Sequence, residues 1–263
     1  MQKFTPELIN KIITLLNTEI IPAEGCTEPI AIAYAAAKAT QILGKKPERM
    51  HISCSGNIIK NVKSVIVPNS GGLIGIGVSA AMGAFAGNPD KELMVISNTT
   101  PEQLIEVRAF LDKKFIHIQH ANVSDKLYIK VKLFAGNESA SVELKQRHTN
   151  ITEIMKNDQI IFQAPHEEKN TQEDPASILT IQLIYDLAKC IDIALIKNLF
   201  DKVILLNSAI ATEGLTHDYG VNIGRNIQKS IENGFYGNDT RNHSASLASA
   251  GSDARMGGSA MPV

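Results

Sequence analysis

The alternation of hydrophobic and polar positions divides the chain into a helical start, a strand-rich middle and a helical end. The sequence TPE at 5–7 gives the N-cap, the proline and the acid that begin a helix, and apolar residues then form one broad face as far as residue 20. An alanine-rich second helix is predicted over residues 30–43, with Thr27 as its N-cap and Gly44 as its stop.

A change of period at Met50 predicts the start of a sheet. Met50, Ile52 and Cys54 alternate with polar residues, which is typical of a half-buried strand and places Cys54 on its inward face. Short polar gaps between the later strands favour an antiparallel meander. A buried helix of small residues and a capped helix are also expected, at 75–86 and 100–114. The further strands are predicted at 64–67, 115–120, 127–134, 139–146, 151–156 and 159–163.

The last third returns to helical patterns. The polar stretch at 166–174 predicts a linker or an exposed loop. Residues 177–194 are apolar on nearly every side, so a central helix with Cys190 packed inside it is expected, and helices are predicted at 196–212, 221–233 and 239–250. These elements predict an α+β fold. We expect a helical domain made of residues 1–44 and 166–263, whose second part is truncated. Residues 45–165 form an α/β domain inserted into it, with a mostly antiparallel sheet.

Composition excludes several classes of protein. The 263 residues are 44% hydrophobic and 20% charged, with a formal net charge of -1, which is typical of a soluble globular protein. No charge excess indicates nucleic acid or an anionic membrane as a partner. Neither a signal peptide nor a membrane span is predicted. The three cysteines are far apart without a CxxC pair, so no disulfide framework is expected and a reducing cytoplasm is favoured.

Cys26 is the first candidate for chemistry. It precedes the predicted N-terminus of the second helix, where free N–H groups and the helix dipole lower a thiol pKa and favour thiolate. Thiolate is the form that attacks a substrate or binds a metal. The alternative is a small buried thiol beside a helix cap.

Four other places offer polar groups, each with a structural alternative. Lys60-Asn61 could bind a carboxylate or supply a base, or be solvated surface. The turn at 68–72 could form an anion-binding nest. His148 could transfer protons or belong to an ordinary turn. Asp253 and Arg255 could form an ion pair, an arginine clamp for a carboxylate, or a frayed tail, and nothing local decides.

Six stretches in order resemble the iron–sulfur L-cysteine desulfidase family, which is related to the alpha chain of bacterial iron–sulfur L-serine dehydratase. Each stretch is weak alone, but six in the family's order are specific. They span nearly the whole chain. The stretches are EGCTEP at 24–29, SGNIIKN at 55–61, VPNSGGLIG at 67–75, HTNI at 148–151, YGVNIG at 219–224 and SDARMGG at 252–258.

The resemblance implies a lyase that converts L-cysteine to pyruvate, ammonia and sulfide, or deaminates serine, with a 4Fe–4S cluster held by three cysteines. Cys26 matches the first cluster ligand. The substrate is then a small amino acid. The site expected on this basis has Lys60 and His148 as catalytic residues, Cys26 as metal ligand, and Asn57, Asn61, Ser70, Gly71, Asp253 and Arg255 as substrate-binding residues.

The sequence departs from the family at Val263, where two further cluster cysteines should follow. Cys54 and Cys190 do not match those positions, so the chain resembles roughly the first three-fifths of a member. We therefore expect a fragment, a truncated product or one half of a split enzyme, inactive alone. A C-terminal partner chain or self-association would cover an apolar patch over 177–250, and the tail after Ala250 should pack poorly. The alternatives are a non-catalytic remnant or partner subunit without a cluster, and a thiol enzyme with His148 as the base for Cys26.

Overall fold

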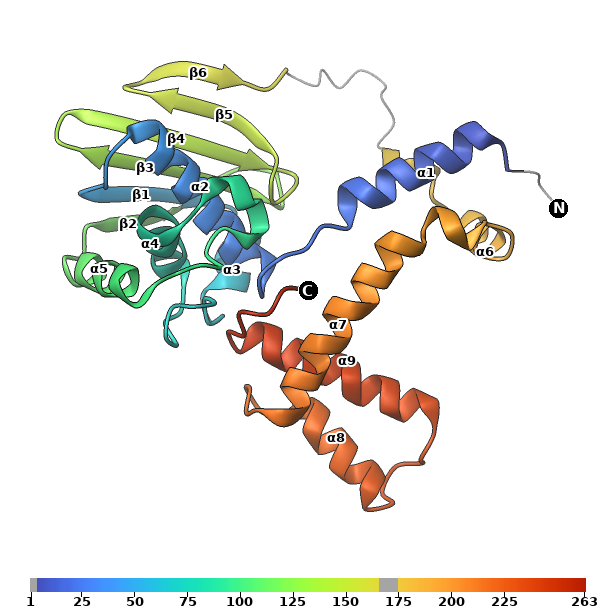
Figure 1. Ribbon diagram of the computed structural model, residues 1–263. Coiled ribbons are helices and arrows are strands. Elements are labelled where there is room, and N and C mark those ends of the chain that lie inside the picture. The colour runs from blue at the N-terminus through green and yellow to red at the C-terminus, as the bar shows by residue number, and fades with distance from the viewer. Residues whose placement is uncertain (1–3, 166–174) are drawn as a thin grey trace.

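The computed structural model describes residues 4–165 and 175–263, and its fold is α+β, as predicted. The six-stranded sheet lies at one end of the molecule, and the helices of the last third extend away from it (Figure 1). The division into domains at 44/45 and 165/166 stays a prediction, and the polar stretch at 166–174 lies outside the described residues. Within residues 4–165 and 175–263, the helices all lack the combination of length and apolar content needed to cross a membrane.

The first two helices begin and end close to their predicted limits. Helix α1 (Pro6–Glu19) is capped by Thr5, whose Oγ1 accepts a hydrogen bond of 3.3 Å from the Leu8 N–H. Helix α2 (Thr27–Leu43) ends at Gly44, which has a left-handed φ of 78°. One detail was wrong. The N-cap is Cys26 rather than Thr27, because the extended backbone turns into the helix one residue earlier than the sequence indicated.

The sheet has the strand order β2-β1-β3-β4-β5-β6. All neighbouring pairs are antiparallel except β1 with β2, because a helical crossover between these two strands returns the chain in the same direction. The predicted meander from the third to the sixth strand is confirmed. The strands are β1 (Arg49–Cys54), β2 (Ile116–His120), β3 (Tyr128–Ala135), β4 (Glu138–Lys145), β5 (Ile151–Lys156) and β6 (Gln159–Gln163).

Helix α2 lies across one face of this sheet, against β3 and β4, and its buried side chains form the core with the inward side chains of the strands. Helix α4 (Ile76–Ala86) packs directly on α2, and α5 (Pro101–Asp112) packs on α4. A Cβ at Gly83 would lie 2.0 Å from the carbonyl oxygen of Ala33. The predicted role of small residues, a close approach of two backbones, is therefore confirmed. The crossover also contains α3 (Gly56–Val62) and the 3-10 helix η1 (Pro89–Met94).

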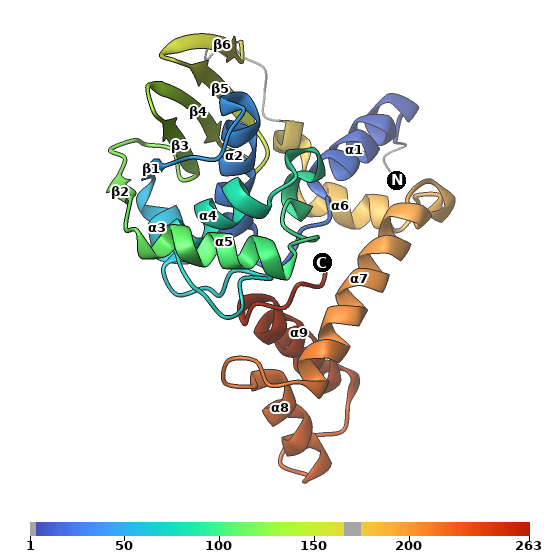
Figure 2. The same ribbon diagram turned by 60° about the vertical axis from the view of Figure 1, so that its left-hand side comes forward.

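The helices after residue 175 form an arm that extends away from the sheet (Figures 1 and 2). Helices α7 and α8 both pack on α9, and glycines permit this, because a Cβ at Gly214 or Gly224 would lie 1.9 Å or 2.3 Å from backbone atoms of Ala250. The elements of the arm are η2 (Pro175–Ile178), α6 (Ile181–Ala188), η3 (Ile193–Leu195), α7 (Lys197–Thr216), α8 (Ile223–Glu232) and α9 (Thr240–Met256).

Three sequence predictions were wrong. Residues 64–67 form no strand, and Ile66 makes only an isolated bridge with Ile74. The segment 177–194 is no central helix, because the side chain of Asp192 caps a separate 3-10 turn through the Ala194 N–H, at 3.0 Å. Cys190 is consequently exposed. The tail after residue 250 is packed, since Ala23 and Val263 exchange backbone hydrogen bonds of 3.1 Å and 2.9 Å.

Candidate functional site

The carboxylate of Glu28, in the first turn of α2, joins two of the six sequence stretches. The Sγ of Cys26 donates a hydrogen bond of 3.1 Å to Oε2 of Glu28, and Thr27 Oγ1 lies 3.4 Å from the same oxygen. The Nδ2 of Asn61, near the end of α3, donates a hydrogen bond of 3.0 Å to Oε1. Both carboxylate oxygens of Glu28 therefore accept hydrogen bonds, Oε2 from Cys26 and Oε1 from Asn61.

Two further stretches face this cluster. Burial lowers the pKa of His148, while the negative charge of Glu28 acts in the opposite direction, so the imidazole lies within electrostatic reach of the carboxylate. The positive charge of Arg255, in the last turn of α9, acts on Cys26 and by itself would lower the thiol pKa. Hydrogen bonds at Glu28 thus join EGCTEP to SGNIIKN, and the charges of His148 from HTNI and Arg255 from SDARMGG act on this pair.

Cys26 is a neutral thiol in this setting, so the predicted thiolate is wrong. Burial raises the pKa of Cys26 to about 12, and the hydrogen bond to Glu28 and its negative charge act in the same direction. The helix N-terminus and Arg255 do not outweigh these effects. Burial by itself would raise the pKa of Glu28, but hydrogen bonds from Cys26, from its own backbone N–H and from Asn61 lower it overall. The pair is accordingly a thiol donor and an ionised acceptor.

The proposed Cys26–His148 thiol enzyme does not fit this arrangement. The hydrogen bond of the thiol goes to Glu28 rather than to an imidazole base. A raised pKa is also the opposite of what an activated cysteine nucleophile requires.

Glu24 is a second carboxyl group of the same hexapeptide, and it is completely buried. Its Oε1 accepts a hydrogen bond of 2.5 Å from Asn69 Nδ2, while Oε2 has no hydrogen-bond partner among the residues that the structure describes. Burial raises the pKa of Glu24 to about 8, opposed by the positive charge of Lys91. The backbone of Glu24 pairs with Pro262, so this carboxyl lies where the sheet half meets the tail of the arm.

The turn at 68–72 packs against the hexapeptide but uses its own polar groups internally. A Cβ at Gly25 would lie 2.7 Å from Cγ of Pro68, so the two stretches touch. The Oγ of buried Ser70 donates to the carbonyl of Val67, at 2.7 Å, and accepts from the Leu73 N–H, at 3.0 Å. The carbonyl oxygens of Ser70 and Gly71 each lie 3.4 Å from Nη2 of Arg108. The substrate-binding roles of Ser70 and Gly71 stay predictions.

Asp253 and Arg255 have separate surroundings. Oδ2 of Asp253 accepts a hydrogen bond of 3.0 Å from the Gly224 N–H, so Asp253 caps the start of α8 and ties YGVNIG to SDARMGG. Arg255 is exposed and lies near Cys26, so the arginine-clamp alternative is compatible with its position. The frayed-tail alternative is wrong, because α9 continues through both residues.

Lys60 and Asn57 lie exposed on α3, in the helix that positions Asn61. Neither side chain makes a hydrogen bond or an ion pair within residues 4–165 and 175–263. Their catalytic and substrate-binding roles stay predictions. The hexapeptide motif pointed to Cys26, but sequence reasoning missed Glu24 and Glu28. The sequence around them does not indicate that the carboxyl of Glu24 would be buried, or that the carboxylate of Glu28 would accept hydrogen bonds from two other stretches.

The described residues do not fit a complete 4Fe–4S cluster. Such clusters take three or four cysteine ligands. Cys54 is fully buried in the core and Cys190 is exposed on the arm, which leaves Cys26 as the thiol of the site. No group of three metal-ligating side chains occurs in the part of the chain that the structure describes. The chain offers one ligand position and no cluster-binding set.

The fold and site define an α+β protein in which the buried thiol of Cys26 pairs with the half-buried carboxylate of Glu28. The chain is similar to proteins named UPF0597. It is 54% identical to one of Fusobacterium nucleatum, over 97% of this chain and 60% of the relative. It is 38% identical to relatives from Lachnoclostridium phytofermentans, over 97% of this chain and 60% of the relative, and from Desulfitobacterium hafniense, over 95% and 57%.

The chain therefore spans about three-fifths of the length of these relatives. Their names give a family and no activity. No family model matches the chain. No solved structure matches it.

Proposed function

We propose that this chain carries the amino-acid-binding and proton-transferring part of a lyase that acts on L-cysteine, or on L-serine. The observation that supports the proposal is the shared carboxylate of Glu28, which accepts hydrogen bonds from Cys26 and Asn61. The charges of Glu28 and His148 act on each other, and the charge of Arg255 acts on Cys26, so four stretches that carry the family resemblance contribute groups near this pair. A purely structural motif would not require a thiol, an amide, an imidazole and a guanidinium in one place.

In such an elimination, a base removes the proton on Cα while the bond between Cβ and sulfur breaks and sulfide leaves. The aminoacrylate product hydrolyses to pyruvate and ammonia. His148 suits the base, because burial lowers its pKa and its neutral imidazole accepts a proton near pH 7. Arg255 suits the carboxylate of the substrate, since guanidinium groups bind carboxylates with two parallel hydrogen bonds. Lys60 and Asn57 would line the outer side of the same site.

The resemblance adds a 4Fe–4S cluster, with Cys26 as one ligand, as a Lewis acid for the leaving group. Because the described residues do not fit a complete cluster, the roles proposed here are those of the chain's own side chains. The single thiol also favours a second candidate. This is a partner subunit that keeps the fold and binds no cluster.

Calorimetric titration with L-cysteine and L-serine tests the binding role. We expect either amino acid to bind, and Arg255→Ala to weaken binding at least tenfold. Arg241→Ala is the matched control, because Arg241 is an exposed arginine of the same helix, 3.9 Å from Asp239 and outside the cluster. An absence of binding at millimolar amino acid, or equal losses in both variants, would refute the proposal.

A further inference from the structure

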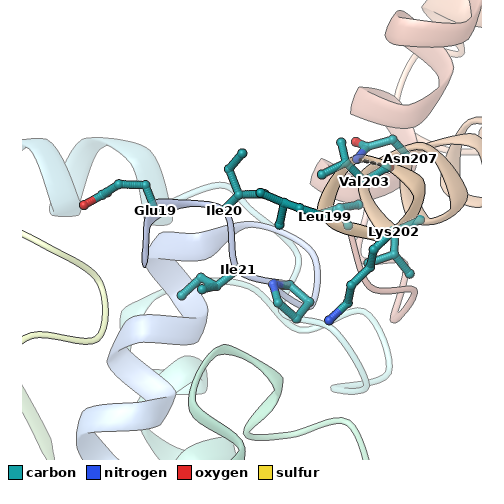
Figure 3. Close-up of a pocket in the computed structure, with 10 residues that line it drawn as sticks. Glu19, Ile20, Ile21, Leu199, Lys202, Val203 and Asn207 are labelled. Carbon is teal, nitrogen blue, oxygen red and sulfur yellow. Dashed lines mark hydrogen bonds between the residues drawn. The ribbon is translucent and has the colours of Figure 1, made fainter. Parts of the chain in front are cut away.

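The first half of α7 carries six large apolar side chains in eight residues, interrupted only by Asp201 and Lys202. Residues 199–206 read LFDKVILL. Leu199, Val203 and Leu206 line a groove, shown in Figure 3, while Ile204 and Leu205 are 62% and 68% exposed. A helix segment this rich in apolar residues is normally buried in a protein interior. This helix is not buried by the residues that the structure describes.

Helix α6 and the turn after it, which precede α7 in the arm, also expose large apolar side chains. Ile181 is 89% exposed and Ile193 is 70% exposed, although both are large aliphatic side chains. Single exposed apolar residues are common on monomers, but a gathering of them indicates a contact surface. The α6–α7 surface is defined here by Ile181, Ile184, Ile193, Phe200, Ile204 and Leu205.

The groove beside this surface suits protein side chains better than a small ligand. Figure 3 shows it between the connection from α1 to α2 and helix α7. Its volume is about 280 Å³, below the roughly 300–1,000 Å³ of typical small-molecule pockets. Ile20, Ile21 and Pro22 line one side. A hole of this size and apolar character accepts the anchoring side chains that dominate protein interfaces.

The open face of the sheet is charged, although the edge strand β6 exposes Ile160, Ile161 and Phe162. It carries ion pairs such as Lys130 with Glu153 and Lys132 with Asp158, both at 2.6 Å. Charged side chains of this kind are depleted at the centres of interfaces. An additional folded segment would therefore gain more free energy from the α6–α7 surface than from this face.

We propose that the α6–α7 surface and its groove form the docking site for the polypeptide that makes up the remaining two-fifths of the UPF0597 relatives. The matched region accounts for 97% of this chain and only 60% of the Fusobacterium nucleatum relative. In this proposal, the rest of that relative packs against a fold like this one. The α6–α7 surface suits that part because it is apolar, exposed and beside a groove. This inference concerns packing and does not depend on the lyase activity.

The test is to co-express this chain with a tagged polypeptide comprising the part of the Fusobacterium nucleatum relative outside the matched region. We expect a one-to-one complex by light scattering. Leu205→Lys should weaken it at least tenfold, while Ile105→Lys should leave it unchanged. Both residues are 68% exposed, but Ile105 lies on α5 of the sheet half. Because both substitutions are at exposed sites, folding should survive, and thermal melts check this.

A second measurement uses the exposed Cys190, between α6 and η3. Its labelling by a maleimide should slow at least tenfold in the complex. Failure to co-purify, equal effects of the two lysine variants, or unchanged labelling would overturn the proposal. A dimer of this chain alone that Leu205→Lys dissociates would assign the surface to a second copy and would also overturn it. The docking test measures molecular mass and cysteine labelling, whereas the lyase proposal is tested by amino-acid binding. Failure of one proposal can therefore be told apart from failure of the other.

Discussion

The thiol of Cys26 is hydrogen-bonded to Glu28, with Sγ 3.1 Å from Oε2. Burial is the largest cause of the raised thiol pKa, and this contact adds to it, because a carboxylate beside a thiol disfavours the thiolate. The helix N-terminus, which favours thiolate, is the weaker influence here. Cys26 is therefore a protonated thiol that donates a hydrogen bond to Glu28. It becomes a thiolate only if a base takes its proton or a metal ion displaces it.

The three cysteines should differ in their rates of alkylation. Burial raises the pKa of both Cys26 and Cys54 to about 12, whereas Cys190 is exposed. With iodoacetamide at pH 8, mass spectrometry should find Cys190 modified first, then Cys26, with Cys54 last, because it is fully buried.

Glu28→Gln should accelerate the alkylation of Cys26 several-fold, since it removes the negative charge that helps to raise the thiol pKa. Glu106→Gln is the control, because Glu106 pairs with Lys46 on the surface of the sheet half. An unchanged Cys26 rate in Glu28→Gln would mean that burial alone sets its reactivity.

The buried carboxyl of Glu24 should make stability fall as pH rises. Its pKa is about 8 in the folded protein and near 4.5 when exposed, so the folded state binds more protons between these values. The stabilisation is fully present below about pH 4.5 and is lost as pH rises through about 8. It amounts to a few kcal/mol, on the order expected for a shift of this size.

Denaturant unfolding between pH 5 and 8 measures this effect as a difference from Glu24→Gln, which has no such titration. The wild-type unfolding free energy should decrease more steeply with pH than that of the variant. Parallel curves would show that Glu24 is ionised in the folded protein throughout this range.

Two glycines of α4 should respond oppositely to alanine. A Cβ at Gly83 would lie 2.0 Å from the Ala33 carbonyl oxygen, so Gly83→Ala has to separate α2 from α4 and should cost about 2–3 kcal/mol. At Gly77 the nearest atom would be 3.5 Å away, so Gly77→Ala should be neutral or stabilise by roughly 0.5 kcal/mol. Thermal unfolding of the two variants checks this, and similar losses in both would mean that the close approach of α2 and α4 is not a determinant of stability.

The fold could be predicted where local patterns decide it. Strand alternation placed Cys54 in the core, and proline and cap signals placed α1 and α5. The parallel pairing of β1 with β2 was missed, because the direction of a strand depends on the crossover rather than on its own residues. The prediction of one buried helix at 177–194 was wrong for a similar reason. An apolar sequence shows that a segment can be buried, but whether it is buried depends on the segments that pack against it.

The candidate site was predictable by residue type but not by charge state. The sequence singled out Cys26 and Asn61, and the structure joins them through hydrogen bonds to Glu28, while the site roles of His148 and Arg255 stay predictions. The predicted thiolate was wrong because burial, and after it the hydrogen bond and charge of Glu28, raise the thiol pKa, and the sequence alone showed neither the burial nor this contact.

The last prediction concerns iron. Anaerobic incubation of the purified chain with ferrous iron and sulfide should yield no stable 4Fe–4S cluster, because such a cluster needs at least three thiolates and the site presents one. Cys54 is in the core and Cys190 is on the arm, so neither can join Cys26 without rearrangement of the fold. After desalting, iron should be far below one cluster per chain, and the broad absorption near ~400 nm should be absent. Cys26→Ser should give the same result. Four irons and four sulfides retained per chain, and lost in Cys26→Ser, would show that the chain assembles a cluster by itself.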